Sequence, residues 1–362
     1  MKNFALILTT VITVYGCTEE APAPPSPPVY DPTPYVIDMT RLPAGTDMVP
    51  LPTDWPLTKQ RVLLGRMMFH DPSLSRDGTQ SCASCHVQGD GFTDLRRFSI
   101  GVKGLAGTRQ SMPLSNLAWH KNGFFWDGRA PRLREQALRP ILDPIEMNNT
   151  MANLEATLNA SQVYRDQFTR AFESDTISYV EIGVALEQYM FTLISGDNKF
   201  DRVFRGEATF TEQEERGRLL FFREFDVTGK KKGAECFHCH GGPNFTNDRY
   251  MNNGLDDDAS FVDLGRAKVT KVPTDNAKFK TPSLRNVAVT PPYMHDGRFA
   301  TLEEVIDHYN AGVKQSSTVD PLMQFLLNPG IKLTSDDKAD LIAFLKTLTD
   351  QTFLTNPAYA KP

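Results

Sequence analysis

The stretches CASCH at residues 82–86 and CFHCH at residues 236–240 decide how this chain folds. Each has the form C-x-x-C-H, the attachment site of a c-type haem, in which two thiols bond to one porphyrin and the next histidine binds its iron. The two copies use four of the five cysteines in a chain of 362 residues. They predict two covalently bound haem c groups, attached through Cys82, Cys85 and His86 and through Cys236, Cys239 and His240.

Zinc binding and disulfide formation are the alternatives for the same thiols. A zinc site made of two C-x-x-C pairs would place the pairs closer together in the sequence and would not need a histidine after both. Haem attachment accounts for both histidines, so we expect haem.

The fifth cysteine, Cys17, ends an N-terminal stretch typical of an export signal. Lys2 gives a positive start, and the apolar run at residues 4–14 is too short to span a bilayer. The sequence VYGC resembles the lipobox of bacterial lipoproteins, although Tyr15 is bulkier than usual there. We expect a signal peptide over residues 1–17, a lipid on Cys17 and a location on the periplasmic side of a bacterial envelope. An ordinary secretion signal with an incidental cysteine is the alternative.

Proline dominates the residues that follow the expected signal. Residues 18–45 include APAPPSPP, and proline lacks the backbone N–H that packed structure needs, so we expect an extended, semi-rigid tether. The remaining length suits two domains, at residues 46–205 and 206–350, with a tail at 351–362. The mild net charge of −5 and the lack of a basic cluster with interleaved aromatics argue against a nucleic-acid partner.

The two halves of the chain repeat one another around the haem motifs. GRMMF at residues 65–69 precedes the first motif, and GRLLF at residues 217–221 precedes the second. After each motif comes an Asp-Gly-Arg, which follows Trp126 in the first copy and His295 in the second. The repeat predicts two similar haem domains.

Helix signals prevail in both halves, and strand signals are scarce. Thr211 begins a capping box for a helix that reaches Phe222, and an apolar stripe ending at Leu348 marks a helix that begins near Thr334. We therefore expect an all-α fold of two tandem cytochrome c-like haem domains with long irregular loops.

Aligning the two copies on Asp-Gly-Arg exposes an asymmetry on the far side of each iron. Tyr309 in the second copy aligns with Pro140 in the first. A tyrosine phenolate can bind haem iron, whereas proline cannot. We expect His240 and Tyr309 to fill both axial positions of the second iron, and the first iron, on His86, to keep one position open for a reactant.

Three side chains are candidates for chemistry at the open position. Gln136 shares a helical face with Pro140 and can hold peroxide or water by hydrogen bonding. Glu146 follows Pro140 and Pro144, which we expect to break the helix, and a buried carboxyl there can take and return a proton. A solvated surface acid is the alternative for Glu146. Trp126 is an oxidisable side chain that can carry an electron between the haems and can equally pack as a core aromatic beside a porphyrin.

Taken together, these motifs resemble those of the bacterial di-haem cytochrome c peroxidases and their relative MauG, over nearly everything after residue 50. The matching stretches, besides the first haem motif, are GRMMF at 65–69, FWDGR at 125–129, QA at 136–137, KTPSLRN at 280–286 and PYMHDG at 292–297. The resemblance implies a peroxidatic N-terminal haem, an electron-transferring C-terminal haem, a calcium ion between the domains and a homodimer. It also implies that Trp126 lies between the haems and that Gln136, Pro140 and Glu146 line the active pocket.

Two departures from the common peroxidase pattern favour the MauG-like branch. Many of the peroxidases close the first haem with a histidine in the loop after its motif, whereas residues 99–104 contain none. They also place methionine where this chain, like MauG, has Tyr309. The calcium ligands that the resemblance implies are backbone oxygens of Thr290 and Pro292 and the side chain of Gln110, which replaces an asparagine.

Other side chains compete for the irons. Met294 is the rival of Tyr309 at the second iron, although we favour packing beside the porphyrin for it. His120 is the candidate outside the family pattern for capping the first iron. We expect His308 to point away from the iron and His295 to bond a haem propionate or a backbone carbonyl.

The leading functional prediction is a di-haem c-type peroxidase. It would reduce hydrogen peroxide to water at the N-terminal haem, with electrons relayed through the C-terminal haem from an external small cytochrome c or cupredoxin. The first alternative is a MauG-like enzyme that uses peroxide to oxidise a protein or organic substrate at long range. The second is a non-catalytic electron carrier, which would need six ligands on both irons.

Overall fold

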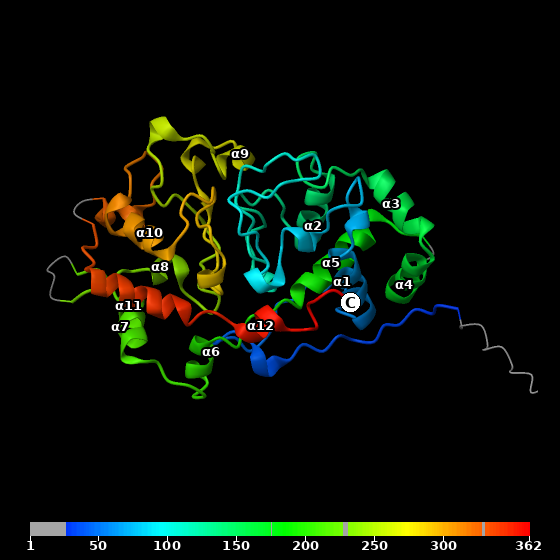
Figure 1. The fold of residues 1–362 in the computed structure, drawn as a ribbon, viewed down its shortest axis with the longest axis horizontal. Coiled ribbons are helices and arrows are strands. Elements are labelled where there is room, and N and C mark those ends of the chain that lie inside the picture. The colour runs from blue at the N-terminus through cyan, green and yellow to red at the C-terminus, as the bar shows by residue number, and fades with distance from the viewer. Residues whose placement is uncertain (1–26, 175, 227–230, 328–329) are drawn as a thin grey trace, which may run out of the picture.

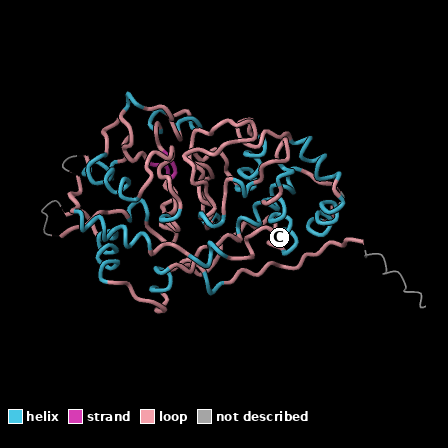
Figure 2. Tube along the Cα trace, viewed as in Figure 1, coloured by secondary structure: helices cyan, strands magenta, loops and turns pink. Residues whose placement is uncertain are grey.

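The computed structural model describes residues 27–174, 176–226, 231–327 and 330–362 (Figure 1). In the first half the helices are α1 (Lys59–Phe69), α2 (Leu133–Leu142), α3 (Met151–Ala160), α4 (Gln162–Phe172), α5 (Tyr179–Phe191) and α6 (Lys199–Phe204). In the second half they are α7 (Glu212–Phe222), α8 (Phe237–His240), α9 (Ala267–Thr270), α10 (Leu302–Asp307), α11 (Ser335–Lys346) and α12 (Gln351–Thr355). Long loops join them (Figure 2). In the part of the chain that the structure describes, no helix is long and apolar enough to cross a membrane.

Each half of the fold is built on two helices that cross at a glycine. α1 packs on α5 in the first half, and α7 packs on α11 in the second. A Cβ on Gly65 of α1 would lie 1.9 Å from the carbonyl oxygen of Ala185, and a Cβ on Gly217 of α7 would lie 1.9 Å from that of Asp340. Only glycine permits these approaches, so the repeated Gly-Arg of the sequence marks a helix crossing.

Two separate hydrophobic cores follow from these helix pairs. The first includes Leu64, Phe69 and Phe168, and the second is an aromatic cluster centred on Phe221 and Phe344. A third, small cluster joins the halves, because Trp126 packs with Ala277 and Phe279.

Over the residues that the structure describes, the fold is helix-rich with one small sheet, so the all-α prediction is confirmed only in this coarser form. The strands β1 (Tyr250–Met251) and β2 (Phe279–Lys280) pair antiparallel, with Tyr250 opposite Lys280. Strands of two residues carry no periodicity that a sequence can reveal. The predicted capping box at Thr211 is confirmed at the start of α7, and the helix expected to begin near Thr334 is α11, which Thr334 caps in the same way.

The prediction that Pro140 breaks its helix is wrong. α2 continues through Pro140 to Leu142. Proline lacks only the hydrogen bond to the carbonyl four residues earlier, that of Gln136, and near the end of a ten-residue helix this loss is tolerated. The chain leaves the helix at Asp143, whose N–H still bonds to the carbonyl of Arg139 at 2.9 Å.

The expected tether is bound to the folded body over the part that the structure describes. The N–H of Asp31 bonds to the carbonyl of Arg170 at 2.9 Å, and Arg41 pairs with Asp197 at 2.6 Å. A 3-10 turn at Met39–Arg41 interrupts this segment, and residues 31–44 do not act as a free spacer because these partners hold them. Cys17 and the signal peptide lie outside the described residues.

The last twelve residues, treated in the sequence as a tail, complete the N-terminal core. Phe353, Leu354 and Tyr359 are buried in the first cluster, and the hydroxyl of Tyr189 in α5 donates to the carbonyl of Tyr359 at 2.7 Å. Figure 1 shows the C terminus beside α1 and α5.

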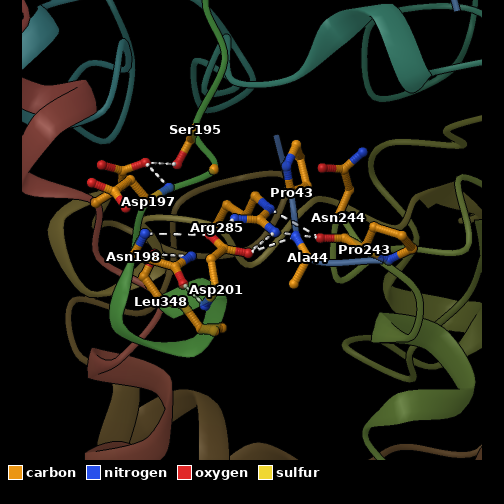
Figure 3. Close-up of polar contacts among 12 residues, drawn as sticks. Pro43, Ala44, Ser195, Asp197, Asn198, Asp201, Pro243, Asn244, Arg285 and Leu348 are labelled. Carbon is orange, nitrogen blue, oxygen red and sulfur yellow. Dashed lines mark hydrogen bonds and ion pairs between the residues drawn. The ribbon is translucent and has the colours of Figure 1, made fainter. Parts of the chain in front are cut away.

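A fully buried ion pair joins the two halves (Figure 3). The two terminal nitrogens of Arg285, Nη1 and Nη2, donate to the Asp201 carboxylate at 2.7 and 2.8 Å, and both side chains are completely inaccessible. The same carboxylate accepts the N–H of Ala44 at 2.8 Å, while the guanidinium also donates to the carbonyl of Pro243. One pair therefore holds α6, the N-terminal segment and the loop after the second haem motif.

We predict that Gly65→Ala lowers the free energy of unfolding by about 1–3 kcal/mol or more, because the new methyl group overlaps the α5 backbone. Thermal unfolding followed by circular dichroism measures the loss. Gly89→Ala is the matched control, since a Cβ there meets no atom within 4 Å. Equal midpoints for the two variants would contradict the helix-crossing role.

Candidate haem and peroxide sites

The two haem motifs hold their histidines in the same way. His86 follows a 3-10 turn over Cys82–Ser84, and its Nδ1 lies 2.8 Å from the carbonyl oxygen of Phe92. His240 ends α8, and its Nδ1 lies 3.1 Å from the carbonyl oxygen of Phe245. Nδ1 must donate to these carbonyls, which leaves Nε2 of each ring unprotonated and free to bind a metal.

An uncommon backbone conformation orients the carbonyls of Phe92 and Phe245 toward these histidines. Phe92 and Phe245 both have left-handed φ angles, of 60° and 51°, although neither is glycine. Both phenyl rings are fully buried in their cores, and this packing offsets the cost of the conformation.

The four motif cysteines are free thiols in separate places. Cys82 and Cys85 line one cavity, and Cys236 and Cys239 line another. Burial raises the pKa of Cys82 and of Cys236 to about 12. This separation argues against a four-thiolate zinc site, and the thiol-plus-imidazole set of each cavity fits one covalently attached haem.

The first cavity, of about 650 Å³, collects the residues expected to be catalytic. Its walls include His86, Gln136, Pro140, Glu146 and Trp126. Burial raises the pKa of Glu146 to about 7, with the charge of Asp143 acting in the same direction. Glu146 is thus a half-buried acid that can gain or lose a proton near neutral pH, and the solvated-acid alternative does not describe it.

A loop with no histidine holds Glu146 in place. The N–H of Val102 donates to the Glu146 carbonyl at 2.9 Å, and a Cβ on Gly101 would lie 2.0 Å from the carbonyl oxygen of Ile145. The backbone at residues 99–104, where many relatives are expected to carry a capping histidine, therefore packs against the turn that bears the carboxyl.

The second cavity, of about 230 Å³, holds both candidate ligands for the second iron. Tyr309 is partly buried in a π-helical turn, and burial raises its pKa to about 12. The side-chain amide of Asn253 lies 3.1 Å from the Tyr309 hydroxyl and 3.4 Å from the sulfur of Met294. No signal in the sequence indicated Asn253, because its partners Met294 and Tyr309 lie 41 and 56 residues further along the chain.

Trp126 lies at the boundary of the two cavities. Its indole N–H donates to the carbonyl of Gln110 at 2.8 Å, and its own carbonyl accepts the N–H of Lys280 at 2.7 Å. All three residues line both cavities. The buried ammonium of Lys280 is paired with Asp248, a second feature that the sequence did not reveal.

The three residues expected to bind calcium lie along the second cavity, but they offer few oxygen ligands. Gln110, Thr290 and Pro292 all line it. The amide nitrogen of Gln110 donates to the hydroxyl of Thr93 at 2.8 Å, and none of the three expected ligands is a carboxylate. Calcium takes about six to eight oxygen ligands, so most would have to come from water, and calcium stays a prediction.

The remaining histidines have other partners. Nε2 of His308 lies 3.0 Å from the Asn253 carbonyl, and the ring of His295 stacks on Phe279 at 3.6 Å. His308 thus bonds to the backbone and does not share the cavity with Tyr309. His120 lines the first cavity, and its Nδ1 lies 3.2 Å from Asp248.

Comparison with known proteins places the chain in a family. The model of the family described as "Di-haem cytochrome c peroxidase" matches residues 59–209. The methylamine utilization protein MauG of Methylophilus methylotrophus is 37% identical over 305 residues, which cover 83% of this chain and 86% of that protein. The cytochrome c551 peroxidase of Nitrosomonas europaea is 33% identical over 309 residues, covering 84% and 85%.

A solved structure agrees with the sequence relatives. The crystal structure of a MauG-like protein associated with microbial copper homeostasis has a TM-score of 0.78 and 33% identity, and covers 96% of this chain and 99% of that one. Two cavities with paired thiols and a free imidazole define a c-type haem oxidoreductase. The chain belongs to the di-haem cytochrome c peroxidase family, which includes the MauG proteins, and membership implies two haem c groups.

We predict that Tyr309→Phe changes the ferric absorption and EPR spectra of the haem-loaded protein, because it removes the phenol oxygen that would bind the second iron. Met294→Leu should leave both spectra unchanged. Tyr293→Phe is the matched control, since Tyr293 lines the same cavity but its hydroxyl bonds to the carbonyl of Val287 at 2.9 Å. A spectral change in Met294→Leu alone would assign the ligand to methionine.

Proposed function

We propose that this protein reduces hydrogen peroxide to water at its N-terminal haem, with electrons that pass through the C-terminal haem. The observation that carries the proposal is the difference between the two cavities. Pro140 lines the first and offers no ligand atom, whereas Tyr309 occupies the equivalent position of the repeat and lines the second. A non-catalytic carrier would need ligands on both sides of both irons, so it has less support.

The haem iron, when bound, supplies the electron chemistry that cleaves the O–O bond. Each peroxide consumes two electrons and two protons and gives two water molecules. Glu146 takes the proton from one oxygen of the peroxide and returns it to the other oxygen, which leaves as water. The Gln136 side chain holds the peroxide by hydrogen bonding, and Pro140 keeps the position clear.

Trp126 is proposed to connect the two redox centres. Its side chain lies in the boundary shared by the cavities, and its N–H is fixed on the Gln110 carbonyl. The donor would be a small cytochrome c or cupredoxin on the periplasmic side of a bacterial envelope, where a lipid on Cys17 would hold the protein. A calcium ion near Gln110, Thr290 and Pro292 and a homodimer complete the proposal.

We predict that Glu146→Gln lowers kcat/KM for peroxide by about 10²–10⁴-fold, because the amide cannot accept the proton. The carboxylate form is the active base, and the pKa of Glu146 is about 7, so wild-type kcat/KM should rise as pH increases through 7. This inflection should vanish in Glu146→Gln. Glu135→Gln, in α2 and paired with Arg132, is the control and should keep both rate and inflection. An unchanged pH profile in Glu146→Gln would remove Glu146 from the mechanism.

A MauG-like oxidation of a protein or organic substrate is the second candidate. It is supported by the loop at residues 99–104, which holds no histidine, by Tyr309, and by the 37% identity to a MauG protein. In this case the electrons would come from the substrate rather than from a small redox protein.

The two candidate activities differ in the oxidation state in which the protein reacts with peroxide. We predict a high-spin ferric EPR signal from one haem of the resting protein, because Pro140 offers no ligand atom and His120, which also lines the first cavity, is paired with Asp248. Stopped-flow mixing of the fully ferric protein with peroxide then separates the candidates. Rapid reaction with a long-lived oxidised product, and no turnover with a reduced cytochrome, favours the MauG-like activity. Reaction only after partial reduction, with steady turnover of the donor, favours the peroxidase.

A further inference from the structure

A cluster of three possible metal ligands lies at the second haem motif and has no part in the proposed function. It consists of Glu224 just after α7, Glu235 just before the motif, and His238 within it. One oxygen or nitrogen atom from each residue lies within 4.8 Å of the others, and in the part of the chain that the structure describes this is the one such group of His, Cys, Asp and Glu.

The geometry directs both carboxylates to one imidazole nitrogen. Nε2 of His238 lies 3.1 Å from Oε2 of Glu224 and 3.8 Å from Oε2 of Glu235. The side chains are 31%, 66% and 13% exposed for His238, Glu224 and Glu235, so water and ions can reach the cluster from outside.

Glu235 is fixed in this position before any ion binds. Its other carboxylate oxygen, Oε1, accepts the N–H of Phe225 at 2.7 Å, which leaves Oε2 turned toward His238. Fixing a ligand through its second atom is how proteins commonly orient metal-binding side chains. Because both carboxylates face the same imidazole nitrogen, their negative charges lie close together and oppose one another when both are ionised.

A divalent cation removes this conflict better than a single proton can. One proton on Nε2 neutralises one charge, whereas a doubly charged ion between the three groups balances both carboxylates. One imidazole and two carboxylates are ligands that zinc and its neighbours accept, with water filling an open position.

We propose that Glu224, Glu235 and His238 bind a divalent transition-metal ion of the zinc type at the edge of the second haem motif. His238 lies two residues from His240, so the bound charge would sit close to the second haem. A nearby positive charge stabilises the electron-richer ferrous form, so the ion should raise the reduction potential of this haem.

The test uses the haem-loaded full chain and Zn²⁺ as the probe. Isothermal titration and equilibrium dialysis should give one EDTA-reversible zinc per chain. His238→Ala and Glu235→Gln should each weaken zinc affinity by at least about 10-fold. Glu303→Gln, an exposed glutamate on α10, is the matched control and should bind as the wild type does.

Two further measurements locate the ion and check the fold. Zinc should protect His238 from diethyl pyrocarbonate, as read by peptide mass spectrometry, and should raise the potential of one haem in wild type but not in His238→Ala. Unchanged Soret spectra of the variants show that both haems are still held. Absence of stoichiometric binding, or equal affinity in His238→Ala and Glu303→Gln, would overturn the proposal and leave a simple His–Glu ion pair.

Discussion

The buried pair of Arg285 and Asp201 is the interaction on which the arrangement of the two halves depends. Neither side chain reaches water, so each charge relies on the other and on the backbone groups around it. Removing one partner from such a pair commonly costs about 3–5 kcal/mol, because the other charge stays buried and uncompensated. Asp201 also caps its own helix through Asn198. The carboxylate therefore fixes α6 and the Arg285 segment in one geometry.

Arg285 carries this constraint toward the second haem site. Its guanidinium bonds to the carbonyl of Pro243, two residues before Phe245, whose carbonyl accepts from His240. The imidazole is thus oriented by a chain of contacts that begins at the junction of the halves. Formation of the junction and orientation of this histidine are parts of the same structure.

The duplicated scaffold makes the difference between its two sites informative. Both halves share a glycine crossing and a histidine fixed by a left-handed phenylalanine. The glycine crossing and the fixed histidine are the same in both halves, but Pro140 lines the first cavity where Tyr309 lines the second. Chemical specialisation here needs few substitutions, because the fold already supplies both cavities and Trp126 between them.

Local sequence predicted what local physics determines. The haem motifs, the capping box at Thr211, the helix that begins near Thr334 and the placement of Gln136 and Glu146 near Pro140 follow from spacing and residue type. The shape of α2 did not, because the effect of a proline depends on where it falls in the helix. Asn253 and the Arg285–Asp201 pair join residues far apart in sequence, and one sequence alone contains no signal for such contacts.

The return of residues 353–359 to the first core has a consequence for how the molecule is made. A ribosome releases the segment from Lys59 to Phe191 long before Phe353 and Tyr359 exist, yet these rings pack against Phe92, whose carbonyl orients His86. During synthesis, the packing around Phe92 in the N-terminal half therefore stays incomplete until these two rings have been made. The second core likewise needs Phe344 and Leu348, so neither half can complete its packing before the C-terminal segment has been made.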